Sequence, residues 1–292
     1  MKHRIGKRAD VAKALVRLLR LDIRAAAAEL RAPGPREERV HRVRQRLKRV
    51  RTILRVLEPA FGERALTLRQ TLAEAARLLA RARDADVAAA SARQLAATTT
   101  PADDAGFDRV AASLDAEAAR VHQERTPLGD VSRRFAEAIA EAATFEPDFD
   151  GQALLAAGLR RAYARGRTAM LKAENSLSTP DLHRWRKTVK DLWHLIRLAR
   201  KRLPKRLVRT GPNLERLGDA LGLGNDHALL AEKLALSPTG DPALMRQLAL
   251  IARRRNALEA EAFALGARLY SRKPKAFAGR LHLHRHKPAQ ES

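Results

Sequence analysis

One stretch of the sequence decides the fold class: residues 40–57 read VHRVRQRLKRVRTILRVL. Its apolar positions recur every three or four residues, which is the spacing of one face of an α-helix. A basic residue follows nearly every apolar position, and one residue turns an α-helix by about 100°. The basic row therefore lies beside the buried face of this helix and not opposite to it. Its members are His41, Arg44, Lys48, Arg51 and Arg55.

The same pattern returns 142 residues further along the chain, where residues 182–197 read LHRWRKTVKDLWHLIR. Trp193 takes the place of Arg51, and the other members of this second basic row are His183, Arg186, Lys190 and Arg197. The predicted helix upstream of each stretch carries a shorter row, Arg17, Arg20 and Arg24 in the first half and Arg160, Tyr163 and Arg167 in the second. Related rows at a nearly fixed spacing indicate an internal duplication.

The rest of the chain is also typical of helices. Alanine, leucine, arginine and glutamate favour helices, and aromatic residues make up only 4% of the sequence. Apolar positions recur at helical spacing almost throughout, with prolines and glycines at the breaks. Two acids, Asp84 and Asp226, are expected to cap helix N-termini. The predicted helices span residues 9–31, 36–58, 63–82, 84–97, 103–125, 128–143, 151–175, 179–203, 205–222, 226–236 and 240–271.

The predicted fold class is all-α. We expect two helical bundles of about four helices or more each, related by a pseudo-two-fold axis around a basic groove or pore. The first bundle is expected within residues 1–145 and the second within residues 146–271. The tail, residues 272–292, is basic and is expected to be disordered. Its alternating histidines leave open whether it binds a metal.

The charge of the chain limits the class of partner. The sequence has 58 Lys and Arg residues against 33 Asp and Glu residues, a formal net charge of +25 at pH 7. Such a field attracts nucleic acids, acidic membrane surfaces and condensed phosphates. The absence of cysteine excludes disulfide bonds, cysteine-ligated zinc and thiol catalysis. A membrane span needs about 20 apolar residues, which no stretch offers, so we expect a cytoplasmic protein that does not insert into membranes.

The position of the basic rows narrows the partner further. Cations beside a packed face lie at the edge of a groove between helices, where their stems pack and their heads converge. Like charges crowded there repel each other unless an anion lies among them. Successive row members climb about 5 Å along the helix, which favours a linear polyanion. The cations on the far faces are expected to be solvated; they are Arg42, Arg46, Arg49, Arg184 and Lys187.

Four short elements resemble those of the CHAD family, the conserved histidine α-helical domain. They are Val-His-x-x-Arg-x-x-x-Lys/Arg-x-x-Arg at residues 40–51, its echo at 182–193, Arg-Asp-Ala-Asp-Val at 83–87 and Asn-Asp-His-Ala-Leu at 225–229. The resemblance spans residues 9 to about 270. It implies two four-helix bundles around a basic pore that binds inorganic polyphosphate, and an association with polyphosphate granules. It also implies ligand contacts at His41, Arg44, Lys48, Arg55, His183, Arg186, Lys190 and Arg197.

Members of this family are often joined to a triphosphate tunnel domain, which would bring a Glu-x-Glu-x-Lys element. The sequence lacks this element, so we expect a stand-alone module.

We therefore predict non-catalytic binding of inorganic polyphosphate, with no metal and no cofactor. Two alternatives stay open: a sequence-nonspecific nucleic-acid-binding protein, and a phosphoryl-handling enzyme that uses His41 and His183. The oligomeric state and the preferred polyphosphate length are also open. The predicted binding residues are His41, Arg44, Lys48, Arg51, Arg55, His183, Arg186, Lys190, Arg197, Arg17, Arg20, Arg24, Arg160 and Arg167.

Overall fold

The computed structural model describes residues 3–99, 106–123, 128–236 and 242–281, and every regular element within these ranges is a helix. The predicted all-α fold class is confirmed. None of the described helices combines the length and the apolar character that a membrane crossing needs. In chain order the helices are α1 (Val11–Glu29), α2 (Arg36–Phe61), α3 (Glu63–Leu78), α4 (Ala80–Thr98), α5 (Phe107–Gln123), α6 (Leu128–Ala143), α7 (Gly151–Ser176), α8 (Thr179–Ala199), α9 (Lys205–Val208), α10 (Gly211–Leu234), α11 (Pro242–Leu269) and α12 (Pro274–Ala278).

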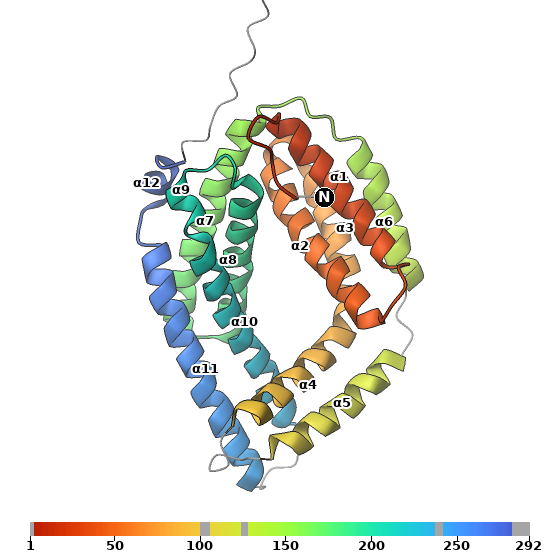
Figure 1. Ribbon diagram of the computed structural model, residues 1–292, viewed down its shortest axis with the longest axis vertical. Helices are drawn as coiled ribbons and strands as arrows, with labels where there is room; N and C mark the ends of the chain where they lie inside the picture. The colour runs from red at the N-terminus through yellow and green to blue at the C-terminus, as the bar shows by residue number, and fades with distance from the viewer. Residues whose placement is uncertain (1–2, 100–105, 124–127, 237–241, 282–292) are drawn as a thin grey trace, which may run out of the picture.

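The helices form two groups that lie side by side (Figure 1). Helices α1, α2, α3 and α6 pack together in one group, and α7, α8, α10, α11 and α12 form the other. Helix α2 contacts both α7 and α8, so it lies at the join between the groups. Helices α4 and α5 pair with each other at one end of the molecule, where α4 packs against α10.

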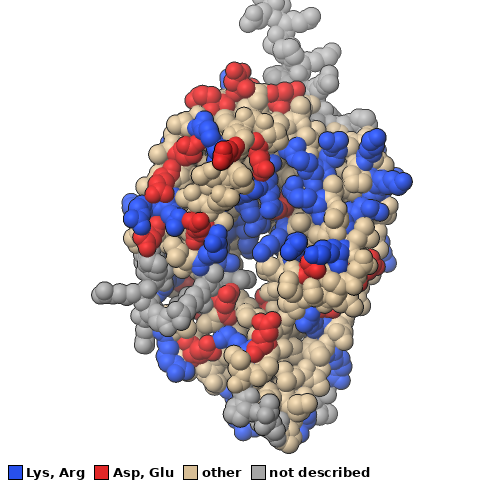
Figure 2. Space-filling view, turned by 180° about the vertical axis from the view of Figure 1, so that it is seen from behind, with Lys and Arg blue, Asp and Glu red and all other residues tan. Residues whose placement is uncertain are grey.

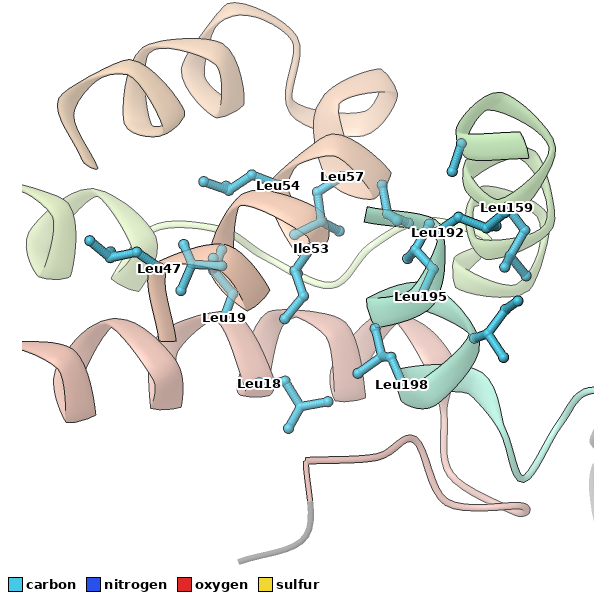
Figure 3. Close-up of a cluster of buried hydrophobic side chains, with 14 of the residues drawn as sticks. Leu18, Leu19, Leu47, Ile53, Leu54, Leu57, Leu159, Leu192, Leu195 and Leu198 are labelled. Carbon is cyan, nitrogen blue, oxygen red and sulfur yellow. The ribbon is translucent and has the colours of Figure 1, made fainter. Parts of the chain in front are cut away.

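The main hydrophobic core runs through both groups of helices. Figure 3 shows leucine side chains of α1, α2, α7 and α8 meeting in it, among them Leu57, Leu159 and Leu192. Every member of the apolar row predicted within residues 40–57 is buried, which confirms the inward face of α2. Each fully buried leucine stabilises the fold by about 1.5–3 kcal/mol. Because α2 is fixed by this row, the neighbouring basic row keeps a fixed direction relative to the core.

A second, smaller core lies at the end of the molecule where α4 and α5 meet α10 and α11. It brings together Leu95, Phe107, Leu230 and Ile251, among others. Both cores therefore contain residues from each side of residue 145. The internal duplication and the units 1–145 and 146–271 stay predictions about the sequence, while the packing joins the two parts.

Helix α10 runs unbroken through the glycine-rich residues 222–225, where the sequence predicted a break. Asp226 is therefore inside α10, and Asp84 is likewise inside α4. Both N-cap predictions are wrong, because these helices begin earlier, at Gly211 and Ala80. Glycine inside a helix costs about 1 kcal/mol relative to alanine, so α10 owes its continuity to tertiary packing.

The first part of the C-terminal tail is helical, contrary to the prediction of disorder from residue 272. Helix α12 forms at Pro274–Ala278, and Phe277 is buried there. Its ring stacks on the ring of Tyr163, with 4.0 Å between the centroids. The histidine-rich part of the tail, residues 282–292, lies outside the described residues.

Candidate anion-binding groove

Two cavities open beside α2 and α8, the helices that carry the long basic rows. The α1-side cavity, about 640 Å³, is lined by α1, α2, α8 and the N-terminal segment. The α3-side cavity, about 530 Å³, is lined by α2, α3, α4, α8 and α10. Lys48 lines both cavities, and we call the two together the α2–α8 groove. Figure 2 shows Lys and Arg side chains gathered in a hollow in the middle of one face of the molecule.

Cations outnumber acids in both cavities. Among the described residues, Asp22 is the acid that lines the α1-side cavity, and Asp84 and Glu232 are the acids that line the α3-side cavity. The cations of the α1-side cavity are Arg4, Lys48, Arg49, Lys190, Arg197 and Arg200. Those of the α3-side cavity are Arg44, Lys48, Arg51, Arg69, Arg77 and Lys187. Six cations on each side make the whole groove electropositive.

The structure brings most of the two long basic rows to this groove. The row members that line a cavity are Arg44, Lys48, Arg51, His183, Lys190 and Arg197. His41 lines neither cavity; it is exposed, and its Nε2 atom lies 2.7 Å from Nε2 of Gln45. The two histidines on which the enzyme alternative rests are therefore not equivalent, because only His183 faces the groove.

A buried acid, Asp191 of α8, lies where α8 meets α2; its side chain is 1% exposed. Its Oδ1 accepts hydrogen bonds from Nη2 of Arg51 at 3.0 Å and from Oγ1 of Thr52 at 3.4 Å, and Arg55 forms an ion pair with it. Burial lowers the pKa of Arg51, and burial together with neighbouring arginines lowers the pKa of Arg55 to about 9. The repeat did not predict this acid, because the first half has Arg49 at the matching position.

A second buried acid, Asp22 of α1, binds arginines on another face of α2. Nη2 of Arg49 lies 2.9 Å from its Oδ1, and Nη1 of Arg46 lies 3.6 Å from the same atom. Arg49 was expected on the solvent face, and this prediction is wrong because α1 and α8 flank α2 and turn Arg49 into the α1-side cavity. Lys187 was also expected on the solvent face; it is exposed, but it lines the α3-side cavity.

Two glycines of α10 make room for the basic row of α8. A Cβ atom at Gly218 would lie 2.7 Å from Cε of Lys190, and one at Gly222 would lie 2.8 Å from Nη2 of Arg186. Both distances are shorter than van der Waals contact, so a larger residue would displace these cations. Nε of Arg186 also donates to the carbonyl oxygen of Gly218 at 3.4 Å, and Nζ of Lys190 lies 2.7 Å from Oδ1 of Asp219. Gly222, the last residue of the predicted helix 205–222, lies inside α10 and serves side-chain packing.

Trp193 lies in the α1-side cavity between two cations of α8. Nζ of Lys190 lies 5.2 Å from the centroid of the indole ring, and the guanidinium carbon of Arg197 lies 4.4 Å from it. Cation–π attraction of this kind aligns the three side chains along the helix. Burial, together with the surrounding lysines and arginines, lowers the pKa of the adjacent His194 to about 3. His194 is therefore neutral at pH 7.

The N-terminal segment, residues 3–10, forms part of the wall of the α1-side cavity. Ile5 is fully buried, and its N–H donates to the carbonyl oxygen of Leu198 at 2.9 Å. Nε of the buried Arg202 donates to a carbonyl oxygen of the segment at 3.1 Å. The end of α8 thus fixes the segment in place. Its residues that line the cavity are His3 and Arg4.

The shorter basic rows of α1 and α7 line neither cavity. Arg20 donates hydrogen bonds of 2.8–2.9 Å to three carbonyl oxygens at the C-terminal end of α6. Arg167 donates to the carbonyl oxygen of Tyr270 at 3.3 Å, at the end of α11. These carbonyl groups lie in the last turns of α6 and α11 or just beyond them, where a helix offers no further N–H donors, so the two arginines act as caps. The other arginines of these rows are exposed, namely Arg17, Arg24 and Arg160, and Tyr163 is buried.

Fold and site together define an all-helical module with a cation-lined groove between two groups of helices. The sequence profile described as the CHAD domain matches residues 14–235, and the chain belongs to the CHAD domain family. This family is generally linked to polyphosphate binding and is generally non-catalytic.

A structural comparison supports the fold. The crystal structure of the CHAD domain from the plant Ricinus communis is similar with a TM-score of 0.64, at 16% identity, over 94% of this chain and 96% of that chain. At this identity the likeness concerns the fold alone. No curated protein matches the chain.

Proposed function

We propose that this protein binds inorganic polyphosphate along the α2–α8 groove and does not cleave it. One observation carries the proposal: cations from both groups of helices line two cavities that share Lys48. A single phosphate ion would engage only a few of these cations. A linear chain of phosphates can run from one cavity to the other and meet all of them.

The residue types suit this ligand. Arginine offers forked donors to phosphate oxygens, whereas lysine acts as a compact point charge. The groove has both, with Arg51 and Arg49 held by buried acids and Lys187 on a longer, more adaptable stem. Partial desolvation, together with neighbouring arginines, lowers the pKa of Lys187 although part of its side chain is exposed, and an anion in the groove would relieve the repulsion.

Nucleic acid is the less favoured ligand, because the indole ring that the described residues place in the groove, that of Trp193, already contacts two cations. Single-strand binding uses exposed aromatic rings. Trp193 lies between Lys190 and Arg197, and Trp185 is fully buried. Among the described residues, the large apolar side chains that are exposed include no aromatic ring.

The test is a competitive titration of the protein with polyphosphate, DNA and RNA of equal phosphate content at about 0.15 M salt. The variant K48A/K187A/K190A removes three cations from the groove. Its matched control, K13A/R31A/K201A, removes three exposed cations that line neither cavity. Because a hydrogen bond to a charged group contributes about 1.5–3 kcal/mol, we expect a loss of at least about 100-fold for the groove variant and less than about threefold for the control.

Each outcome decides something. Equal losses in the two variants would mean that bulk charge alone attracts the anion. Equal competition by DNA or RNA would favour the nucleic-acid alternative. Shortening of the polyphosphate during incubation, followed by gel electrophoresis, would contradict binding without cleavage, and His183→Ala would then be the first variant to assay.

We further place the protein in the cytoplasm at polyphosphate granules, since a groove of this charge would be saturated where polyphosphate is concentrated. A fluorescent fusion should colocalise with stained granules, and the K48A/K187A/K190A form should be diffuse. A wild-type fusion that stays diffuse in granule-containing cells would contradict this placement.

A further inference from the structure

A cluster of arginines lies on the α7 side of α2, and the mechanism proposed for the groove does not use it. We call it the α7-side arginine cluster. Its residues come from α2, α3 and α7, and Arg69 belongs both to the cluster and to the wall of the α3-side cavity. The members are Arg55, Arg69, Arg161 and Arg165, with Glu58 among them.

The cluster has more positive charge than its acids balance. The positive charges of Arg69 and Arg165 both act on Arg55, and that of Arg161 acts on Arg165. Glu58 accepts a hydrogen bond from Nη1 of Arg69 at 2.8 Å. Arg55 is bound to Asp191, which also binds Arg51 of the α3-side cavity. Arg161 and Arg165 are therefore left with Glu58 as a partner at a distance.

The two arginines of α7 also have buried donors. Nη2 of Arg161 and Nε of Arg165 are buried and have no hydrogen-bond partner among the described residues. Burial lowers the pKa of both guanidinium groups, and neighbouring arginines lower it further. A desolvated guanidinium N–H without an acceptor is costly, and an oxyanion offers acceptor atoms to several such donors at once.

We propose that the α7-side arginine cluster is a second oxyanion site, which takes phosphate groups of the same polyphosphate chain where it leaves the α3-side cavity. This inference rests on the proposed function. Arg69 provides the continuity, because it lines the α3-side cavity and its charge acts on both Arg55 and Arg165 of the cluster. The polyphosphate then continues around α2 onto α7, and the bound segment of polyphosphate is longer than the part that the two cavities hold.

The alternative is that the long stems of these arginines only pack between helices, as amphipathic side chains often do. The two roles differ in what truncation changes. A packing role makes R161A/R165A less stable and affects ligands of every length alike. If the cluster is an anion site, R161A/R165A is no less stable than the wild type, since repulsion is relieved. Its affinity is then lowered only for a polyphosphate long enough to reach the cluster.

The experiment compares the wild type, R161A/R165A, and a matched control, K201A/R209A, whose two exposed cations line neither cavity. Affinities are measured for long-chain polyphosphate and for tripolyphosphate, together with the thermal unfolding midpoint. We expect R161A/R165A to bind the long chain at least about tenfold more weakly, with a salt dependence reduced by about two charges. We expect its affinity for tripolyphosphate to stay within about twofold, its midpoint to be unchanged or raised, and R161K/R165K to recover part of the loss.

Long-chain affinity of R161A/R165A equal to that of K201A/R209A would overturn the inference. So would a lowered midpoint with equal losses for the short and the long ligand, because that is the signature of packing. The proposed function fails separately: it falls if the wild type binds neither ligand, or if K48A/K187A/K190A binds the long chain as well as the wild type.

Discussion

The two buried carboxylates beside α2 make an informative comparison. Asp22 and Asp191 are each 1% exposed, and each binds two arginines of α2. Asp22 comes from α1, so its ion pairs stay within one group of helices. Asp191 comes from α8, so its ion pairs cross from one group to the other. The arginines of α2 are thus held by one acid from their own group of helices and by another that joins the two groups.

This difference shows how a crowded row of cations is kept in place before a ligand arrives. An internal carboxylate on each side of α2 fixes arginines that would otherwise repel each other. Binding then needs less ordering of side chains, and preorganisation of this kind favours affinity. As a consequence, the fold depends on two buried charges. Changes to these charges are expected to have the largest effects.

The largest effect is expected from Asp191→Asn. The substitution leaves Arg51 and Arg55 without their carboxylate across the join, and removing one partner of a buried ion pair costs about 3–5 kcal/mol. Urea unfolding monitored by circular dichroism measures the change. Added polyphosphate should restore more stability to this variant than to the wild type. A loss below about 1 kcal/mol would mean that Asp191 does not join the bundles energetically.

A smaller effect is expected from Asp22→Asn. Arg46 keeps Glu29 as a partner at 3.2 Å, so one of the two arginines remains paired, and we expect a loss of about 2 kcal/mol. The same unfolding experiment gives the value. If Asp22→Asn destabilised the protein as much as Asp191→Asn, the distinction between pairs within a bundle and pairs across the join would be lost.

The next effect concerns pH and His194 in the α1-side cavity. Its pKa is about 3 in the folded protein, against about 6.5 in an unfolded chain. The unfolded state therefore binds a proton between these values when the folded state does not, and stability falls as the pH falls through this window. His194→Gln should lose less stability than the wild type between pH 7 and pH 5, by on the order of 1 kcal/mol. His41→Gln, at an exposed position, is the control; an identical pH dependence in all three proteins would contradict the account.

The smallest effect is expected at Trp193, which lines the α1-side cavity. Trp193→Ala removes the ring between Lys190 and Arg197, and a cation–π contact contributes about 0.5–1 kcal/mol. We expect about two- to fivefold weaker polyphosphate binding, with Trp193→Phe between this variant and the wild type. Since Trp185 is fully buried, quenching of tryptophan fluorescence by the ligand should report on Trp193 and disappear in both variants. If Trp193→Phe bound polyphosphate more weakly than Trp193→Ala, the ring would not be what aligns Lys190 and Arg197.

The sequence allowed prediction of what depends on helical periodicity. The buried row of α2 and the basic row beside it follow from spacing alone, and two of the predicted binding residues, Lys48 and Lys190, line the same cavity. Long-range packing was out of reach. Arg49 turned inward because α1 and α8 flank α2, and Gly222 stayed inside a helix because Arg186 fills the space above it.

The acids were hardest to predict, because their role depends on partners far away in the sequence. Asp191 binds Arg51, which is 140 positions away. Arg20 and Arg167 looked like members of anion-binding rows, yet they cap α6 and α11. A basic pattern alone does not distinguish a ligand contact from a cap, since a carbonyl oxygen and a phosphate oxygen accept the same donors.

The N-terminal segment has a consequence for synthesis of the chain. Arg202 binds the carbonyl oxygen of Ala9 across 193 positions, and ribosomes add about 5–20 residues per second. The segment therefore waits about 10–40 s for the partners that fix it. During this time the basic row of α2 has already emerged without Asp191, and it is exposed to any polyanion near the ribosome. The α1-side cavity is completed only after Arg202 has been synthesised. The N-terminal segment, which forms part of its wall, is therefore translated first and assembled last.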